Sequence, residues 1–370
     1  MANAAVTAQQ LADLHQAFLD NAKPFYGEPY ATVNFGTAAQ TSNQIRIPNA
    51  MLLSRSFLLV EGSATISIPA TSTVDFTEEG LYGLIPNVSQ SVGLSAKPID
   101  VSAFTLAQKL GMDYPAYQEL ENMNVTGTTF PYANTTAAPV SETFDFSFVI
   151  DAPNVYSEAG LQGLIMMQNQ SVAGNFTISW SGTTAENAIF TATTGTNATF
   201  TALSATVTLA SELYPVPNSI AQGAPDLTRY PILQETQYPL TGAKTIVSID
   251  PGLEIMRVIL HMYNVGVYDA ANALQLQTIK WSWNGGAVSQ IDTGVWVLNF
   301  LAQKRYANTV ISQIGKGTYI LDFDRQSPRE WFNSTGVTDL KLQFSFGATP
   351  AANSYVNIAL ESMLDISGAM

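Results

Sequence analysis

The chain offers few residues of the types that enzymes and metal sites use. Histidine occurs only at His15 and His261, and cysteine is absent. Zinc sites and histidine-dependent triads need two or more such residues close together, so the sequence argues against both. We expect structural roles for the two histidines, because His15 lies on the apolar stripe of a predicted helix and His261 in an apolar strand.

Three further patterns resemble chemical sites but favour structural interpretations. Residues 315–318 share a Gly-Lys pair with phosphate-binding loops, but that lysine is followed by glycine and the upstream glycine is missing. Asp322 and Asp324 share one strand face and could bind a divalent ion, although we expect a solvated or arginine-paired edge. Trp281 and Trp283 could stack on sugars, as in lectin-like sandwiches, but alternation beside an isoleucine favours a core position.

No reaction is therefore predicted, and we expect neither catalysis nor a cofactor nor a metal ion. The sequence lacks the Gly-x-Ser-x-Gly pattern of a nucleophile elbow. Glu78 and Glu79 lie in a loop-like context, where we expect solvated carboxylates.

Strict alternation of apolar and polar residues defines the elements. Phe144, Phe146 and Phe148 alternate with Asp145 and Ser147, and similar runs recur in both halves of the chain. Side chains of a strand point to opposite faces with period two, so each run has one face to bury. Many such strands separated by turn residues predict an all-β protein, built as two consecutive jelly-roll β-sandwiches with a short N-terminal amphipathic helix.

The predicted domain organisation has four parts. Residues 1–30 form an N-terminal helical arm, and 31–214 form a first jelly roll with a loop insertion at about 111–142. Residues 215–243 contain several prolines and glycines without periodicity, so we interpret them as a linker or crossing. Residues 244–370 form the second jelly roll. Predicted strands include 56–68, 92–105, 143–150, 174–181, 199–210, 244–249, 253–264, 277–283, 317–323, 339–346 and 354–361, and 290–309 is predicted as a helix or a strand pair.

Residues 7–22 predict one amphipathic helix. Thr7 and Gln10 have the spacing of a capping box, and Lys23-Pro24 ends the segment. Its apolar stripe contains Leu11, Leu14, His15, Phe18 and Leu19.

Composition and charge indicate which kinds of molecule the chain can bind. The chain has 370 residues, of which 46% are hydrophobic and only 12% charged, which suits two globular domains with largely neutral polar surfaces. Residues 1–240 contain 19 acidic and 6 basic residues, a net charge of −13, whereas the remainder has 10 and 9. Nucleic-acid binding needs clustered lysine and arginine, so we expect none. We find neither a secretory signal nor an apolar run of membrane-spanning length, and expect synthesis as a soluble protein in the cytoplasm.

Two segments resemble a known family. In 149–180, a strand ending in Ala152-Pro153 is followed by a Tyr-Ser-Glu turn, a short apolar helix and another alternating strand. In 301–325, a basic Ala-Gln-Lys-Arg run leads to a Lys-Gly-Thr-Tyr strand. Both segments, with the glutamine-rich N-terminal helix, resemble tectivirus-type double jelly-roll major capsid proteins. The first match is carried by Ala152, Pro153, Tyr156, Ser157, Glu158, Leu161 and Gly163.

The resemblance implies a structural capsid subunit of the virion. It implies homotrimers of pseudo-hexagonal outline that tile an icosahedral shell over an internal membrane, with contacts to neighbouring trimers and to vertex and cement proteins. The N-terminal helix would lie on the inner, membrane side, and the loop 111–142 would rise outside.

Two groups of residues are candidates for assembly contacts. One is the helix stripe. The other is a basic group in the second half that we expect to pair with acids of neighbouring copies. The alternative function is a carbohydrate-binding or adhesive β-sandwich, and a cupin-like enzyme ranks lower because its histidine ligands are missing. The candidate assembly residues are Leu11, Leu14, Phe18, Leu19, Lys304, Arg305, Arg325 and Arg329, with Lys316 beside them.

Overall fold

The structure is a computed structural model, and it describes most of the chain. The described residues are 7–27, 31–42, 45–93, 97–113, 123–156, 161–168, 174–219, 222–269, 271–284, 290–306, 317–323 and 331–365.

The first half folds into two facing sheets, named here 1A and 1B. Sheet 1A has the order β2 (Ala31–Phe35), β15 (Thr199–Tyr214), β5 (Leu52–Ile68) and β11 (Val140–Pro153), with β1 (Phe25–Tyr26), β9 (Asn124–Thr126) and β12 (Ile165–Met166) added to it. Sheet 1B has the order β8 (Ile99–Val101), β7 (Asn87–Ser91) and β13 (Asn175–Trp180), and β3 (Gln40–Thr41) and β4 (Ile45–Arg46) both pair with β13. A third, small sheet contains β10 (Tyr132–Ala133), β6 (Thr73–Phe76) and β14 (Phe190–Thr194).

The second half repeats this plan in sheets 2A and 2B. Sheet 2A has the order β16 (Arg229–Pro239), β25 (Tyr355–Asp365), β18 (Glu254–Asn264) and β22 (Thr318–Asp322), with β19 (Val267–Tyr268) and β23 (Phe332–Asn333) also pairing with β18. Sheet 2B has the order β17 (Lys244–Ile249), β24 (Leu340–Phe346), β20 (Leu276–Trp283) and β21 (Gln290–Gly294). In each half the first strand of sheet A pairs with the last strand of that half, as expected for two jelly rolls.

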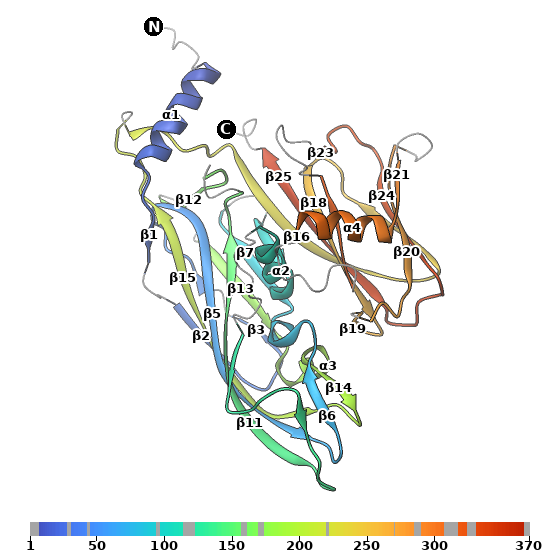
Figure 1. Ribbon diagram of the computed structural model, residues 1–370. Coiled ribbons are helices and arrows are strands. Elements are labelled where there is room, and N and C mark those ends of the chain that lie inside the picture. The colour runs from blue at the N-terminus through green and yellow to red at the C-terminus, as the bar shows by residue number, and fades with distance from the viewer. Residues whose placement is uncertain are drawn as a thin grey trace.

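Four α-helices accompany the sheets in the described part of the chain, together with two short 3-10 helices, η1 (Gly80–Leu84) and η3 (Gly182–Ala185). The α-helices are α1 (Ala8–Asn21), α2 (Ala103–Asp113), the short α3 (Glu186–Ile189) and α4 (Val295–Arg305). Helix α1 and the end of β25 lie at one end of the molecule, whereas β5, β11 and the small sheet extend to the other end (Figure 1). Among the described residues, no helix combines the length and the apolar character needed to cross a membrane.

The two jelly rolls share one continuous sheet. Strand β8 of the first roll pairs in parallel with β16 of the second, with Leu233 opposite Ile99 and Gln234 opposite Asp100. Sheets 1B and 2A thereby join into a single eleven-stranded sheet. Helix α2 lies between the two rolls (Figure 1), and ten of its eleven residues, Ala103 to Met112, are buried.

The predicted alternation explains the cores. Phe144, Phe146 and Phe148 are buried inside the first roll, and Trp281 and Phe344 inside the second. Strand β18 is buried at all nine positions between its terminal residues. One of its faces packs on the second core through Val258, and the other packs on the first roll through Ile259. A strand covered on both sides explains why this segment reads as a continuous apolar run.

Four local predictions are corrected by the structure. The predicted strand 92–105 contains the short β8 and then the start of α2, because the run Ala103–Leu106 buries a helix rather than a strand. The predicted loop 111–142 contains the end of α2 and strands β9 and β10, while 114–122 lie outside the described residues. Strand β16 occupies much of the predicted linker 215–243, since its prolines fall at positions compatible with pairing to β25.

The fourth correction concerns the short apolar helix expected after Tyr156. The described residues 161–168 contain turns and the two-residue strand β12, which pairs with β5. The preceding Ser157 and Glu158 lie outside the described residues. For 290–309 the sequence predicted either a helix or a strand pair. The described residues of this segment form one strand, β21, followed by one helix, α4.

Candidate functional site

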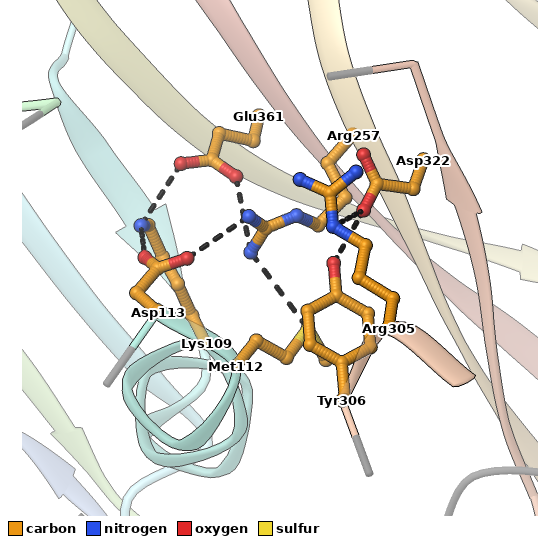
Figure 2. Close-up of polar contacts among 8 residues, drawn as sticks. All are labelled: Lys109, Met112, Asp113, Arg257, Arg305, Tyr306, Asp322 and Glu361. Atoms are coloured by element: carbon orange, nitrogen blue, oxygen red, sulfur yellow. Dashed lines mark hydrogen bonds and ion pairs between the residues drawn. The ribbon is translucent and has the colours of Figure 1, made fainter. Parts of the chain in front are cut away.

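In the described part of the chain, four paired charges, three of them buried and one half-buried, lie together at the boundary of the two jelly rolls. They are Lys109 and Asp113 on α2, Arg257 on β18 and Glu361 on β25, and we call them the boundary cluster (Figure 2). Lys109 Nζ lies 2.9 Å from Glu361 Oε1 and also pairs with Asp113. Arg257 Nη2 lies 2.9 Å from Asp113 Oδ1, and its Nη1 lies 3.5 Å from Glu361 Oε2. Two cations of opposite rolls thus alternate with two anions of opposite rolls.

Burial makes this alternation necessary. A buried charge without a partner is costly, so each ion here depends on its counterions. Burial opposes the charged form of Lys109, but the carboxylates of Asp113 and Glu361 outweigh it and raise the pKa of Lys109. Burial likewise opposes ionisation of Asp113, but Lys109 and Arg257 lower its pKa to about 2. Lys109, Arg257 and Asp113 therefore stay charged across the neutral range.

A second layer of residues extends the cluster along sheet 2A. Arg305 Nε lies 2.9 Å from Asp322 Oδ2, and the Tyr306 hydroxyl donates to the same oxygen at 2.5 Å (Figure 2). The Tyr306 ring also lies 5.9 Å from the guanidinium carbon of Arg257, within the range of a cation–π contact. Asp322 therefore belongs to an arginine-paired edge, as expected, and Asp324 lies outside the described residues.

The start of α2 is also held by the second roll. Glu235 of β16 accepts hydrogen bonds from the Ser102 backbone N–H at 2.8 Å and from the Ser102 and Thr105 hydroxyls at 2.9 Å. An anion at this position satisfies donors at the helix N-terminus and interacts favourably with the helix dipole. Burial raises the pKa of Glu235. Side chains of sheet 2A therefore bind both ends of α2: Glu235 contacts its start, and Arg257 and Glu361 contact its end.

Glu79 contradicts the expectation of a solvated carboxylate. It is buried at the same boundary and accepts a hydrogen bond from the Tyr263 hydroxyl of β18. Burial raises the pKa of Glu79 to about 7, the hydrogen bond from Tyr263 opposes this, and the nearby charge of Glu235 adds to it. Glu79 therefore stays protonated to a higher pH than an exposed glutamate.

The two histidines and two tryptophans have the structural surroundings that were expected. His261 is buried, lies 3.1 Å from the Thr318 hydroxyl through Nδ1, and has a pKa lowered to about 3 by burial. His15 stacks on Phe18. Trp281 is buried, and half-buried Trp283 packs edge-on against Phe332. Among the described residues, no group of histidine, aspartate and glutamate is arranged to hold a metal ion.

The predicted assembly residues fall in different surroundings. Phe18 is 3% exposed and packs on Leu52 and Leu164, whereas Leu11 is 56% exposed; Leu14 and Leu19 are half-buried. Lys304 is exposed. Arg305 forms an ion pair with Asp322 of the same chain, whereas the prediction was an ion pair with a neighbouring copy. Lys316, Arg325 and Arg329 lie outside the described residues.

Sequence reasoning missed the boundary cluster. A signal was available, because Arg257 interrupts the apolar run of β18, and Lys109 interrupts an apolar helix. Charged residues are rarely buried without partners, so two such interruptions indicate a pair. Their pairing could not be inferred, because α2 and β18 are far apart in the sequence.

Comparisons with known proteins agree with this architecture. No protein-family model and no curated protein sequence matches the chain. The crystal structure of the STIV major capsid protein superposes with a TM-score of 0.58 at 12% identity, covering 92% of this chain and 96% of that chain. An atomic structure of Sulfolobus Turreted Icosahedral Virus gives 0.57 at 13% identity, with 95% and 94% covered. The PBCV-1 virus capsid gives 0.56 at 10% identity, with 91% and 95% covered.

The chain therefore has the double jelly-roll fold found in viral major capsid proteins. The similarity covers both rolls and nearly the whole of each compared chain. It confirms the fold expected from the sequence resemblance.

Proposed function

We propose that this protein is the major capsid protein of an icosahedral virus, a structural subunit whose activity is assembly rather than catalysis. The observation that carries the proposal is the double jelly roll, which spans nearly the whole chain and nearly the whole of capsid proteins of known structure. A fold of this kind, with an ion-pair network that joins its two halves, suits a building block.

The boundary cluster supports this function by joining the two rolls into one unit. A shell subunit has to keep the angle between its two rolls fixed, because errors in that angle accumulate around a closed assembly. The shared sheet, the buried α2 and the alternating ions of Lys109, Arg257, Asp113 and Glu361 all oppose hinge motion there. Three such subunits would present six rolls in a pseudo-hexagonal trimer.

The arrangement of the ends suits an orientation in a shell. Helix α1 lies at one end, and the small sheet containing β10 lies at the opposite end (Figure 1). We place α1 on the inner side, toward an internal membrane, and the segment containing β9 and β10 outside. The partners would be other copies of the chain and vertex and cement proteins, with no cofactor and no direct contact with nucleic acid.

The test is the assembly state of the purified protein. Size-exclusion chromatography with light scattering should give a trimer that resists dilution, and electron cryomicroscopy should show particles of hexagonal outline. A monomer that binds immobilised glycans and forms no trimer would favour the adhesive alternative instead.

A further inference from the structure

Helices α2 and α4 occupy equivalent places in the two jelly rolls. Helix α2 lies between β8 and β11 in the chain, and α4 lies between β21 and β22; these strands hold the same positions in sheets 1B and 1A as in 2B and 2A. The two helices also share the tetrapeptide Leu-Ala-Gln-Lys, at 106–109 and 301–304. This match fixes the alignment of one helix on the other.

The two helices differ in what covers their outer face. On α2, Thr105 contacts Glu235, Gln108 accepts from Thr318, and Lys109 pairs with Glu361, so this face is covered by sheet 2A. The aligned positions on α4 are Phe300, Gln303 and Lys304, and all three are exposed.

The outer face of α4 is apolar as well as uncovered. Phe300 is 61% exposed, and Trp296, one helical turn before it, is 76% exposed. Residues four apart on a helix are neighbours on one face, so Trp296, Phe300 and Lys304 form a single stripe. Large exposed aromatic residues on one helix face are typical of an interface.

Sheet 1A repeats the features with which sheet 2A receives α2. In sheet 2A, Arg257 lies opposite Glu361, and Ile259 lies opposite Ala359. In sheet 1A, Arg55 lies opposite Glu212, and Phe57 lies opposite Ala210, with the same two-residue spacing between equivalent strands. The positions of Ile259 and His261 correspond to Phe57 and Leu59, but the first pair is fully buried and the second is only half-buried.

We propose that α4 of one copy docks on sheet 1A of a second copy, in the manner in which α2 docks on sheet 2A within the chain. In this contact Lys304 pairs with Glu212, as Lys109 pairs with Glu361. Trp296 and Phe300 cover the half-buried Phe57 and Leu59. The charge balance favours this contact, because the exposed lysine meets the half of the chain that carries a net charge of −13.

This proposal rests on the proposed function and gives it a geometry. The contact is head-to-tail, so it either closes into a ring or continues as an open filament. If the internal junction turns the chain by one sixth of a turn and each contact between chains repeats that rotation, six rolls close into a ring of three copies.

Charge exchange between the two sides tests the pairing. We expect Lys304→Glu and Glu212→Lys each to weaken the trimer, because each places like charges in contact. The protein concentration below which trimers dissociate should rise by about tenfold or more. The double variant should recover most of the loss, and Lys244→Glu, a matched reversal on exposed sheet 2B, should change nothing. Circular dichroism would show that each variant is folded.

Crosslinking provides a test that does not depend on affinity. The chain has no cysteine, so Lys304→Cys combined with Glu212→Cys gives a protein with two thiols only. A short bis-maleimide should yield covalent trimers in denaturing gels, whereas Lys244→Cys with Glu212→Cys should yield none.

The outcomes separate the two proposals. A trimer whose stability and crosslinking ignore residues 304 and 212 would overturn the interface and leave the capsid function standing. A wild-type protein that stays monomeric at all concentrations would overturn both.

Discussion

At the residue scale, the boundary cluster stabilises the fold only while it is complete. Each of Lys109 and Arg257 contacts both Asp113 and Glu361, so no single residue can be removed without leaving an opposite charge with one partner. The cost of truncating such a network is therefore larger than the net value of any pair in it.

Replacing Lys109 with methionine should lower the free energy of unfolding by about 3–5 kcal/mol, because buried Glu361 and half-buried Asp113 are left with one fewer cation. Urea denaturation followed by tryptophan fluorescence measures the change. Lys97→Met is the matched control: its lysine pairs with Asp100 at 3.0 Å on the surface, and its loss should cost about 0–1 kcal/mol. Equal effects of the two substitutions would show that the cluster has no special role.

Glu79 should make stability fall as the pH rises toward neutrality. Its pKa in the folded state is about 7, raised from 4.5, so its contribution is complete below pH 4.5 and is lost as the pH rises through 7. Glu79→Gln cannot ionise, so its stability relative to the wild type should increase between pH 5 and pH 8. Thermal unfolding at both pH values measures this, with Glu61→Gln at an exposed site as control. A difference that does not vary with pH would contradict the assigned protonation.

At the element scale, α1 is anchored at one end only. Its capping box forms as predicted, and Phe18 enters a small core with Leu52, while Leu11 near the start is exposed. Gly223 lies against the same helix, with the Ala224 backbone N–H donating to the Leu14 carbonyl at 3.0 Å. The second half of α1 therefore belongs to the subunit, and the first half is available to other contacts.

Phe18→Ala should loosen α1 without unfolding the rolls. Removing a buried phenylalanine leaves the helix without its main apolar contact. We expect amide hydrogen exchange in 11–21 to accelerate about tenfold or more, with little change in the strands. Leu11→Ala should leave exchange unchanged, and a similar acceleration in both variants would show that α1 frays as a whole.

At the scale of the whole molecule, the class of fold was easier to predict from the sequence than the segments that connect the strands. Alternation located the long strands, because one buried face imposes period two; Phe144 to Phe148 and Trp281 show this directly. It failed at α2, where burial on all sides leaves only an apolar run, and at β16, where the prolines at 231 and 239 indicated a break in place of a strand. The pairing within the candidate site could not be predicted for a different reason, because it depends on contacts between distant segments, such as Lys109 with Glu361.

Strand β16 makes the second jelly roll begin before residue 244. It pairs with β25 along Arg229–Pro239, so a fragment starting at 244 would expose the whole edge of β25. We expect fragment 222–370 to unfold cooperatively in urea and fragment 244–370 to show no cooperative transition, because an unpaired edge strand of this length promotes aggregation. The fluorescence of buried Trp281 reports the core in both fragments. The same midpoint for the two fragments would mean that β16 contributes nothing to the second roll and serves only to connect it to the first.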